Sequence, residues 1–186
     1  MTPQDAVPLF LSPFIFLRHG ETETNRLGLI AGSTDVELNE SGRQQAWRAA
    51  ELLGSRGVDA IYSSTLRRAR DTADCVAAVL GLNITFVSEL AERSWGELEG
   101  RPRELRVREM TPPGGEGPGE FSARTLAGLR KIPRSQLPLI VAHSGTFRVL
   151  SSRLGIAMPP EPIQNSQPVR FVPPPVAGAR WSLEIL

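Results

Sequence analysis

Short, wholly apolar runs alternate along this chain with longer stretches in which apolar residues recur at helical spacing. Strands buried on both faces of a sheet give continuous apolar runs, and helices that cover the sheet give the periodic stretches. We expect strands at 14–17, 58–62, 84–87, 137–142, 169–172 and 181–185, and helices at 66–80 and 147–154 with a further one beginning near 41. The pattern predicts an α/β fold, a three-layer α/β/α sandwich with a mostly parallel central sheet. The length of 186 residues fits a single domain over 1–186.

Local signals indicate where the helices begin and end. Ser41 and Gln44 have the spacing of a capping box, so we expect Ser41 to be the N-cap and Gln44 to reach back to it. That helix is expected to stop within 54–57, where glycines occur, and 66–80 is the clearest helix of the chain. The run Pro-Pro-Gly-Gly-Glu-Gly-Pro-Gly at 112–119 predicts a loop or lid.

The balance of charges limits the classes of partner. A formal net charge of +1 argues against a dedicated nucleic-acid or membrane surface. Arginine far outnumbers lysine, of which Lys131 is the only one. Arginine can grip phosphate or carboxylate in two places, although a coding bias is the simpler explanation of the total. We expect neither nucleic acid nor a membrane as a partner, and the sequence leaves a homodimer open.

Residues that commonly bind metals are scarce. Cys75 is the only cysteine and the chain has two histidines, so no Cys/His set has the spacing of a zinc site. We expect no metal and no cofactor. The apolar stretch 7–17 is interrupted by prolines, lacks the basic start of a secretory signal and is too short to span a bilayer, so we expect a cytoplasmic enzyme. The proline-rich stretch 159–175 gives no functional signal.

Both histidines follow expected buried strands. The expected strand 14–17 ends in Arg18 and His19, and His143 comes directly after 137–142. In open α/β sheets, ligands bind beyond the carboxyl ends of the strands. A lone histidine after a strand is more often structural, but here both histidines of the chain lie there, each next to glycine or serine and followed by helix-type sequence. The pattern therefore indicates an active site.

Four short segments resemble the motifs of a known family. The run Arg-His-Gly at 18–20 resembles the signature of the histidine phosphatase superfamily, which includes phosphoglycerate mutases and fructose-2,6-bisphosphatases. The segments 63–73, 90–100 and 141–145 resemble its second, third and fourth motifs, in the required order. Four motifs in order are far more specific than Arg-His-Gly alone. The resemblance covers roughly 14–155 and implies branch 1 of the superfamily, with a phosphoglycerate mutase-like fold.

The resemblance implies a catalytic set that the residue types also justify chemically. The nucleophile would be His19, because a neutral imidazole nitrogen can attack phosphorus and form a phosphohistidine. Arg18, Arg68 and a protonated His143 would surround the phosphate oxygens with positive charge. Glu92 aligns with the proton donor of the family and would protonate the leaving oxygen and then activate water. Other glutamates lie close by in the sequence, so this last assignment stays open.

Six further residues are candidates for binding phosphate or the rest of the substrate: Thr22, Asn25, Ser33, Trp95, Ser144 and Gly145. Thr22 and Asn25 also suit turns or helix caps, Trp95 also suits core packing, and a loop serine needs no function. A helix that begins near Gly145 would offer backbone N–H groups to an anion. Ser144 stands where many relatives have glycine, which would narrow or re-polarise the pocket.

The resemblance leaves the reaction type open. Phosphoglycerate mutases of the family are longer, carry tyrosine at the position of Trp95 and have extra basic residues in a middle insertion. Here the middle segment, 101–124, is short and rich in glycine and proline. We therefore predict a metal-independent phosphomonoesterase that acts on a small phosphorylated metabolite. Two alternatives are a cofactor-dependent phosphoglycerate mutase-type phosphotransfer and a catalytically silent domain that binds a phospho-ligand or a phosphoprotein.

Overall fold

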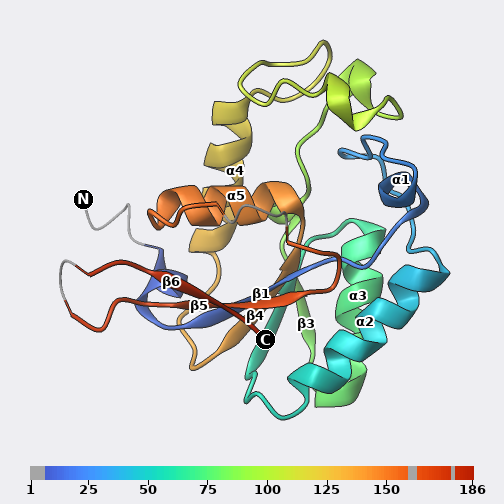
Figure 1. Ribbon diagram of the computed structural model, residues 1–186. Helices are drawn as coiled ribbons and strands as arrows, with labels where there is room; N and C mark the ends of the chain where they lie inside the picture. The colour runs from blue at the N-terminus through green and yellow to red at the C-terminus, as the bar shows by residue number, and fades with distance from the viewer. Residues whose placement is uncertain (1–6, 159–162, 177–178) are drawn as a thin grey trace.

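The computed structural model of the chain describes residues 7–158, 163–176 and 179–186 (Figure 1). The strands are β1 (Phe14–Arg18), β2 (Ala60–Ser63), β3 (Ile84–Phe86), β4 (Pro138–Ala142), β5 (Pro168–Val172) and β6 (Ser182–Ile185). The helices are α1 (Glu23–Arg26), α2 (Glu40–Leu53), α3 (Arg67–Leu80), α4 (Pro118–Arg130) and α5 (Ser144–Arg153). Short 3₁₀ segments occur at η2 (Pro8–Leu11), η3 (Ser88–Leu90), η4 (Gly96–Leu98) and η5 (Arg103–Leu105).

The strands form one sheet in the order β3-β2-β4-β1-β5-β6. Neighbouring strands from β3 to β1 pair in parallel, and β5 is antiparallel to both of its neighbours. Successive side chains of β1 point to opposite faces, as in any strand. Ile15 and Leu17 belong to the core beneath α2 and α3, whereas Phe14 and Phe16 belong to the core beneath α4 and α5. The three-layer sandwich with a mostly parallel sheet is therefore confirmed (Figure 1).

The start of α2 differs from the expectation. Asn39, not Ser41, is the N-cap, and its side-chain oxygen accepts the N–H of Gly42 at 2.8 Å. Ser41 already lies inside the helix, and Gln44 donates to the carboxylate of Glu40 rather than to a cap. Asparagine is as good a cap as serine, and Asn39 precedes Ser41 by two residues, so the helix begins earlier than expected. The later part of the expectation is confirmed, because α2 ends at Leu53 with Gly54 as its C-cap.

The helix α4 was not expected. It begins at Pro118, so only the first part of the expected loop 112–119 is a loop. Proline is well suited to the first turn of a helix, where its missing N–H costs nothing. The buried side of α4 contains a threonine and Gly128, so it lacks a clear apolar stripe that would have predicted a helix. Similarly, α5 begins at Ser144, three residues before the expected start, without a side-chain cap.

Within the described residues, none of the helices combines the length and the apolar character that crossing a lipid bilayer requires.

Candidate active site

The two histidines lie side by side because the strands before them are neighbours in register. Arg18 at the end of β1 pairs with Ala142 at the end of β4, so His19 and His143 follow at the same level of the sheet. The N–H of His19 donates to the carbonyl of Ala142 at 3.0 Å, and the two imidazole centroids are 5.2 Å apart. Both rings are buried at the carboxyl ends of the strands, where α/β sheets bind ligands.

The ring of His19 is held in one tautomer. Its Nδ1 atom lies 2.7 Å from the carbonyl oxygen of Gly20, which can only accept, so Nδ1 carries the proton and Nε2 keeps its lone pair. The N–H of Gly20 donates to Oγ1 of Thr72 at 3.0 Å, and that hydroxyl donates to the carbonyl of Arg68 at 2.7 Å. Thr72 is fully buried, so α3 holds the backbone of Gly20, whose carbonyl orients the His19 ring.

Burial and positive neighbours keep both imidazoles neutral. Burial lowers the pKa of His19 well below its usual value, and the guanidinium groups of Arg68 and Arg18 lower it further. The pKa of His143 is lowered first by burial and then by Arg68, His19 and Arg18. A neutral His19 is the form that can attack phosphorus. Without a bound phosphate His143 is therefore neutral, because its cation would be desolvated among other cations, and the expected protonation of His143 beside a phosphate stays a prediction.

We expect both imidazole rings to resist protonation to well below pH ~6.5, the usual midpoint for histidine. A histidine of the unfolded chain takes up its proton near ~6.5, so between the two pKa values the unfolded state binds more protons and stability falls as the pH falls. An NMR titration of the ring carbon-bound protons measures this, and His19→Ala assigns the two signals. The same chain unfolded in urea is the control, and a native ring that titrates with the urea-unfolded midpoint would contradict the expectation.

Arg18 and Arg68 line the same cavity as His19. Arg68 is fully buried in the first turn of α3, and its Nη1 and Nη2 donate to the carbonyls of Thr34 and Gly32 at 2.9 and 2.8 Å. Arg18 donates through Nη1 to the carbonyl of Ile163 at 2.9 Å. The Nε atoms of both arginines are buried and have no hydrogen-bond partner within the described part of the chain. Buried donors without partners are costly, and both residues belong to the lining of the cavity, where an anion would meet their positive charge.

Glu92 lines this cavity too, and the start of α5 holds its carboxylate. Its Oε2 accepts from the N–H of Gly145 at 3.0 Å and from Oγ of Ser144 at 3.5 Å, and its Oε1 accepts from the N–H of Arg93 at 2.9 Å. A Cβ atom at position 145 would lie 2.1 Å from Oε1 of Glu92, so a glycine is required for this close approach. The N–H of Gly145, expected to bind an anion directly, instead binds the Glu92 carboxylate.

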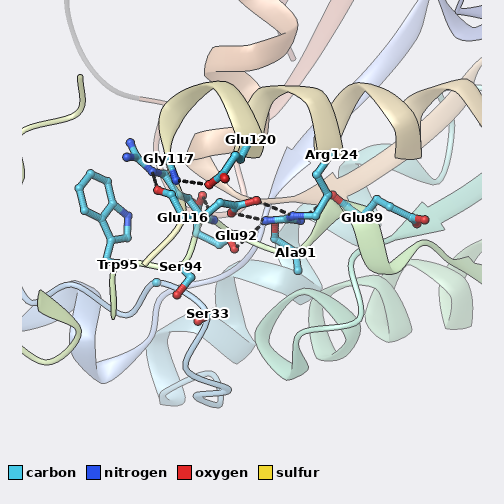
Figure 2. A network of polar contacts seen from close by, with 12 residues as sticks. Ser33, Glu89, Ala91, Glu92, Ser94, Trp95, Glu116, Gly117, Glu120 and Arg124 are labelled. Atoms are coloured by element: carbon cyan, nitrogen blue, oxygen red, sulfur yellow. Dashed lines mark hydrogen bonds and ion pairs between the residues drawn. The ribbon is translucent and has the colours of Figure 1, made fainter. Parts of the chain in front are cut away.

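An arginine of the unexpected helix α4 fixes the backbone that carries Glu92. Figure 2 shows Arg124 reaching from α4 to this segment, where it donates to the carbonyls of Glu89 and Ala91 at 2.8 and 3.0 Å. It also pairs with the carboxylate of Glu116 at 2.8 Å. Because α4 was not expected from the sequence, this support for Glu92 was missed as well.

Thr22 and Ser33 are not among the residues that line the cavity, whereas Asn25 is. Thr22 is fully buried as the N-cap of α1, where its hydroxyl accepts the N–H of Asn25 at 3.2 Å, so its capping role is the one that the structure displays. Ser33 is exposed, and its hydroxyl donates to the carboxylate of Glu99 at 2.9 Å. The cavity-lining candidates are therefore Asn25, Trp95, Ser144 and Gly145.

Asn165 is a residue of the site that sequence reasoning missed. Its Nδ2 donates to the carbonyl of His19 at 2.9 Å and to Oδ1 of Asn25 at 3.1 Å. The Oδ1 of Asn25 also accepts the N–H of Thr22 at 3.3 Å, so the amide oxygen is used and the NH₂ group is the end left for a ligand. Asn165 belongs to the proline-rich stretch 159–175, of which 159–162 lies outside the described residues. A lone asparagine in such a stretch gives a single sequence no functional signal.

The side chains of the site surround a cavity of about 370 Å³. Seven arginines line it: Arg18, Arg68, Arg93, Arg103, Arg106, Arg108 and Arg148. Among the described lining residues Glu92 is the only carboxylate, and Trp95 and Phe121 supply aromatic surface. The middle segment 101–124, which was described above only as short and rich in glycine and proline, thus contributes Arg103, Arg106 and Arg108 to the cavity. No cluster of three or more His, Cys, Asp or Glu side chains suited to a metal ion occurs within 7–158, 163–176 and 179–186.

The family model of the histidine phosphatase superfamily, branch 1, matches residues 14–168. The chain belongs to this family. This histidine phosphatase is 33% identical over 144 residues to an uncharacterized phosphatase, PhoE, of Bacillus subtilis, with 74% of this chain and 75% of that protein covered. It is 35% identical over 155 residues to a probable phosphoglycerate mutase, GpmB, of Salmonella paratyphi B, with 74% and 72% covered.

Among solved structures, the histidine phosphatase resembles a mycobacterial glucosyl-3-phosphoglycerate phosphatase in complex with VO3. The TM-score is 0.78 at 26% sequence identity, and the match covers 94% of this chain and 98% of the other. The resemblance found in the four sequence motifs and the phosphoglycerate mutase-like fold are thereby confirmed.

Proposed function

We propose that this histidine phosphatase hydrolyses a small phosphorylated metabolite through a phosphohistidine on His19. The observation that carries the proposal is the state of the His19 ring. Its Nδ1 proton is committed to the carbonyl of Gly20, its depressed pKa keeps it neutral, and its Nε2 lone pair is free at a cavity lined by Arg18 and Arg68. A neutral nitrogen beside two guanidinium groups is suited to attack a phosphate dianion.

In the first step, Nε2 of His19 forms a bond to phosphorus while the bond from phosphorus to the ester oxygen breaks. Arg18 and Arg68 offer their buried N–H groups to the equatorial oxygens, which carry the charge in the transition state. The departing alkoxide needs a proton, and Glu92 in its carboxylic-acid form is the donor that lines the cavity. The products of this step are the free alcohol and a phosphohistidine.

In the second step, water attacks the phosphorus atom of the phosphohistidine. The Glu92 carboxylate left by the first step takes a proton from this water, the bond between phosphorus and Nε2 breaks, and inorganic phosphate is released. His143 is a neutral ring beside the phosphate position, with Nε2 at 2.8 Å from Oγ of Ser64. A bound phosphate dianion opposes the effect of the neighbouring arginines on the pKa of His143, so the ring can take a proton when the anion arrives.

Hydrolysis is favoured over mutase chemistry by the neighbours that share this fold. The similar solved structure is named as a phosphatase and so is the relative of Bacillus subtilis, whereas the relative of Salmonella is named as a probable mutase. The assay that separates the two reactions feeds 3-phosphoglycerate with and without a bisphosphoglycerate primer. Release of inorganic phosphate without the 2-isomer supports the phosphatase, and primer-dependent formation of the 2-isomer supports the mutase.

The proposal also predicts that EDTA leaves the hydrolysis of a generic aryl phosphate unchanged. The positive charge that phosphoryl transfer needs comes from arginine side chains at the cavity, so no step depends on a metal ion. Enzyme treated with EDTA and then freed of chelator by gel filtration should keep its kcat and KM. If activity were lost and returned on addition of Mg²⁺ or Zn²⁺, the positive charge at the phosphate would come from a metal ion and not from the arginines alone. If untreated protein released no phosphate at all, the alternative of a silent binding domain would replace the proposal.

A further inference from the structure

A loop between α1 and α2 holds the guanidinium group of Arg68. The carbonyls that accept from its Nη2 and Nη1 atoms, at 2.8 and 2.9 Å, are those of Gly32 and Thr34. Because both acceptors come from the segment 32–34, the orientation of the guanidinium depends on where this loop lies. The loop itself is on the surface, so something other than burial has to fix it.

The carboxylate of Glu99 binds the N–H and hydroxyl groups of the same loop. Its Oε1 accepts from the N–H and the hydroxyl of Ser33 at 2.8 and 2.9 Å. Its Oε2 accepts from the N–H of Thr34 at 2.9 Å and from the hydroxyl of Thr34. A fifth donor is the N–H of Trp95, at 3.0 Å from Oε1. One side chain thus ties the loop 32–34 to the segment that begins η4.

A single peptide group joins Glu99 to Arg68. The N–H of Ser33 and the carbonyl of Gly32 belong to one trans peptide unit, which is planar and rigid, and they point in opposite directions. Glu99 accepts from the N–H, and Arg68 donates to the carbonyl. A shift of the carboxylate is therefore passed on to the guanidinium through one rigid unit, and hydrogen bonds in such a chain also polarise one another.

The close approach of Glu99 to the loop requires glycine at position 32. A Cβ atom there would lie 2.2 Å from Oε1 of Glu99. The φ angle of Gly32 is +56°, in the left-handed region that glycine adopts without the steric cost of a side chain. The backbone of the loop is thus shaped to bring its donors onto the carboxylate.

The charge of Glu99 also acts on Arg68. Burial lowers the pKa of Arg68, and the carboxylates of Glu92, Asp35 and Glu99 oppose this effect. Burial by itself would raise the pKa of Glu99, but the hydrogen bonds that it accepts outweigh burial and lower its pKa below the usual value. Glu99 is therefore ionised at neutral pH and supports the cationic form of Arg68.

We propose that Glu99 is a positioning residue of the phosphate site, which fixes the guanidinium of Arg68 through the loop 32–34. Glu99 is not among the described residues that line the cavity, so it acts through Arg68 and not on the substrate. Ser33, which the sequence analysis placed among the candidates for binding substrate, belongs to this support. The role rests on the proposed function, in which Arg68 binds the phosphate oxygens.

The variant Glu99→Gln keeps the size of the side chain but places an NH₂ group against one pair of donors. We expect kcat/KM for an aryl phosphate to fall by about 10- to 10²-fold, because a small misplacement of a binding group is costly to catalysis. The fold should persist, since the exposed donors of Ser33 and Thr34 can bind water and Asp35 still accepts the N–H of Arg67 at 2.6 Å.

The matched control is Glu97→Gln. Glu97 lies two residues earlier, is exposed and is not among the residues that line the cavity, so kcat/KM should stay within about twofold of wild type. Circular dichroism and the melting temperature of both variants check the fold. If Glu99→Gln lowered only the melting temperature and kept the wild-type kcat/KM, Glu99 would be a stabilising loop contact and the positioning role would be wrong.

A double-mutant cycle tests whether Glu99 acts through Arg68. In protein that already carries Arg68→Lys, the change Glu99→Gln should lower kcat/KM by less than about twofold further. Losses that multiply would show that the two residues act independently and would overturn the proposal. The milder variant Ser33→Ala/Thr34→Val removes only the two hydroxyl donors and takes the place of Glu99→Gln if that protein does not fold. It should lower kcat/KM about two- to fivefold, again only where Arg68 is present.

Calorimetric titration with inorganic phosphate repeats the cycle without turnover. The dissociation constant should rise at least about fivefold in Glu99→Gln and should change little when Arg68→Lys is already present. If the wild type hydrolysed the ester but Glu99→Gln equalled it in kcat/KM and in phosphate affinity, the positioning role would be wrong and the proposed function would stand. If phosphate binding showed the expected coupling but no protein hydrolysed the ester, the positioning role would stand and the proposed function would be wrong.

Discussion

Replacement of His19 by alanine is expected to lower kcat for an aryl phosphate by at least ~10³-fold, about 4 kcal/mol of activation free energy. The reason is that, among the described residues that line the cavity, no other side chain offers phosphorus a neutral nitrogen with a free lone pair. His143 is the second imidazole, but its Nε2 is engaged with the hydroxyl of Ser64 at 2.8 Å. Arg18 and Arg68 can bind phosphate without being able to form the covalent intermediate.

Rapid-quench experiments with ³²P-labelled substrate measure the intermediate itself. Wild-type enzyme should hold label that survives base and is lost in acid, as a phosphohistidine does, and His19→Ala should hold none. His143→Gln is the comparison variant, because it removes the second imidazole and keeps the nucleophile: it should still acquire label. Circular dichroism of each variant checks the fold. A loss of less than about tenfold in His19→Ala would mean that the nucleophile lies elsewhere.

The position of the catalytic pair was predictable because it depends on strands. The apolar runs before His19 and His143 mark two buried strands, and any two neighbouring parallel strands bring their carboxyl ends to one edge. The register that places Arg18 opposite Ala142 could not be derived, because nothing in an apolar run specifies which residue faces which. The strand pattern already placed both histidines at an active site, and the motifs added the role of each.

The supporting residues could not be predicted, because their roles come from tertiary contacts. Arg124 stabilises the Glu92 segment from a helix whose buried face contains glycine and threonine, and so it gave no periodic signal. Asn165 reaches back to His19 from 146 residues further along the chain. Arg103, Arg106 and Arg108 were visible in the sequence, but their place at the cavity depends on the loop that Arg93 holds. Single-sequence reasoning reads local chemistry and misses such distant hydrogen bonds.

Arg68→Lys is expected to lower kcat/KM by about 10²- to 10³-fold, the usual effect of removing one preorganised donor from a charged transition state. Arg68 lines the cavity while its Nη1 and Nη2 hold the carbonyls of Thr34 and Gly32, and its Nε has no hydrogen-bond partner among the described residues. An ammonium group has its donors on a single atom, so it cannot hold the loop and reach a phosphate oxygen together. The substitution keeps the positive charge, so the loss of kcat/KM measures what the geometry of the guanidinium group contributes to catalysis.

Arg67→Lys is the matched control for this experiment. Arg67 precedes Arg68 on α3, is exposed and pairs with Glu37 at 3.0 Å, so the same substitution there should change kcat/KM by less than about twofold. Inhibition by vanadate, which adopts the five-coordinate geometry of the transition state, should weaken in Arg68→Lys in proportion to the loss of kcat/KM. A purely structural role would lower the melting temperature and leave vanadate affinity of the folded fraction unchanged. If Arg68→Lys and Arg67→Lys changed kcat/KM by the same factor, the assignment of Arg68 to the phosphate site would be wrong.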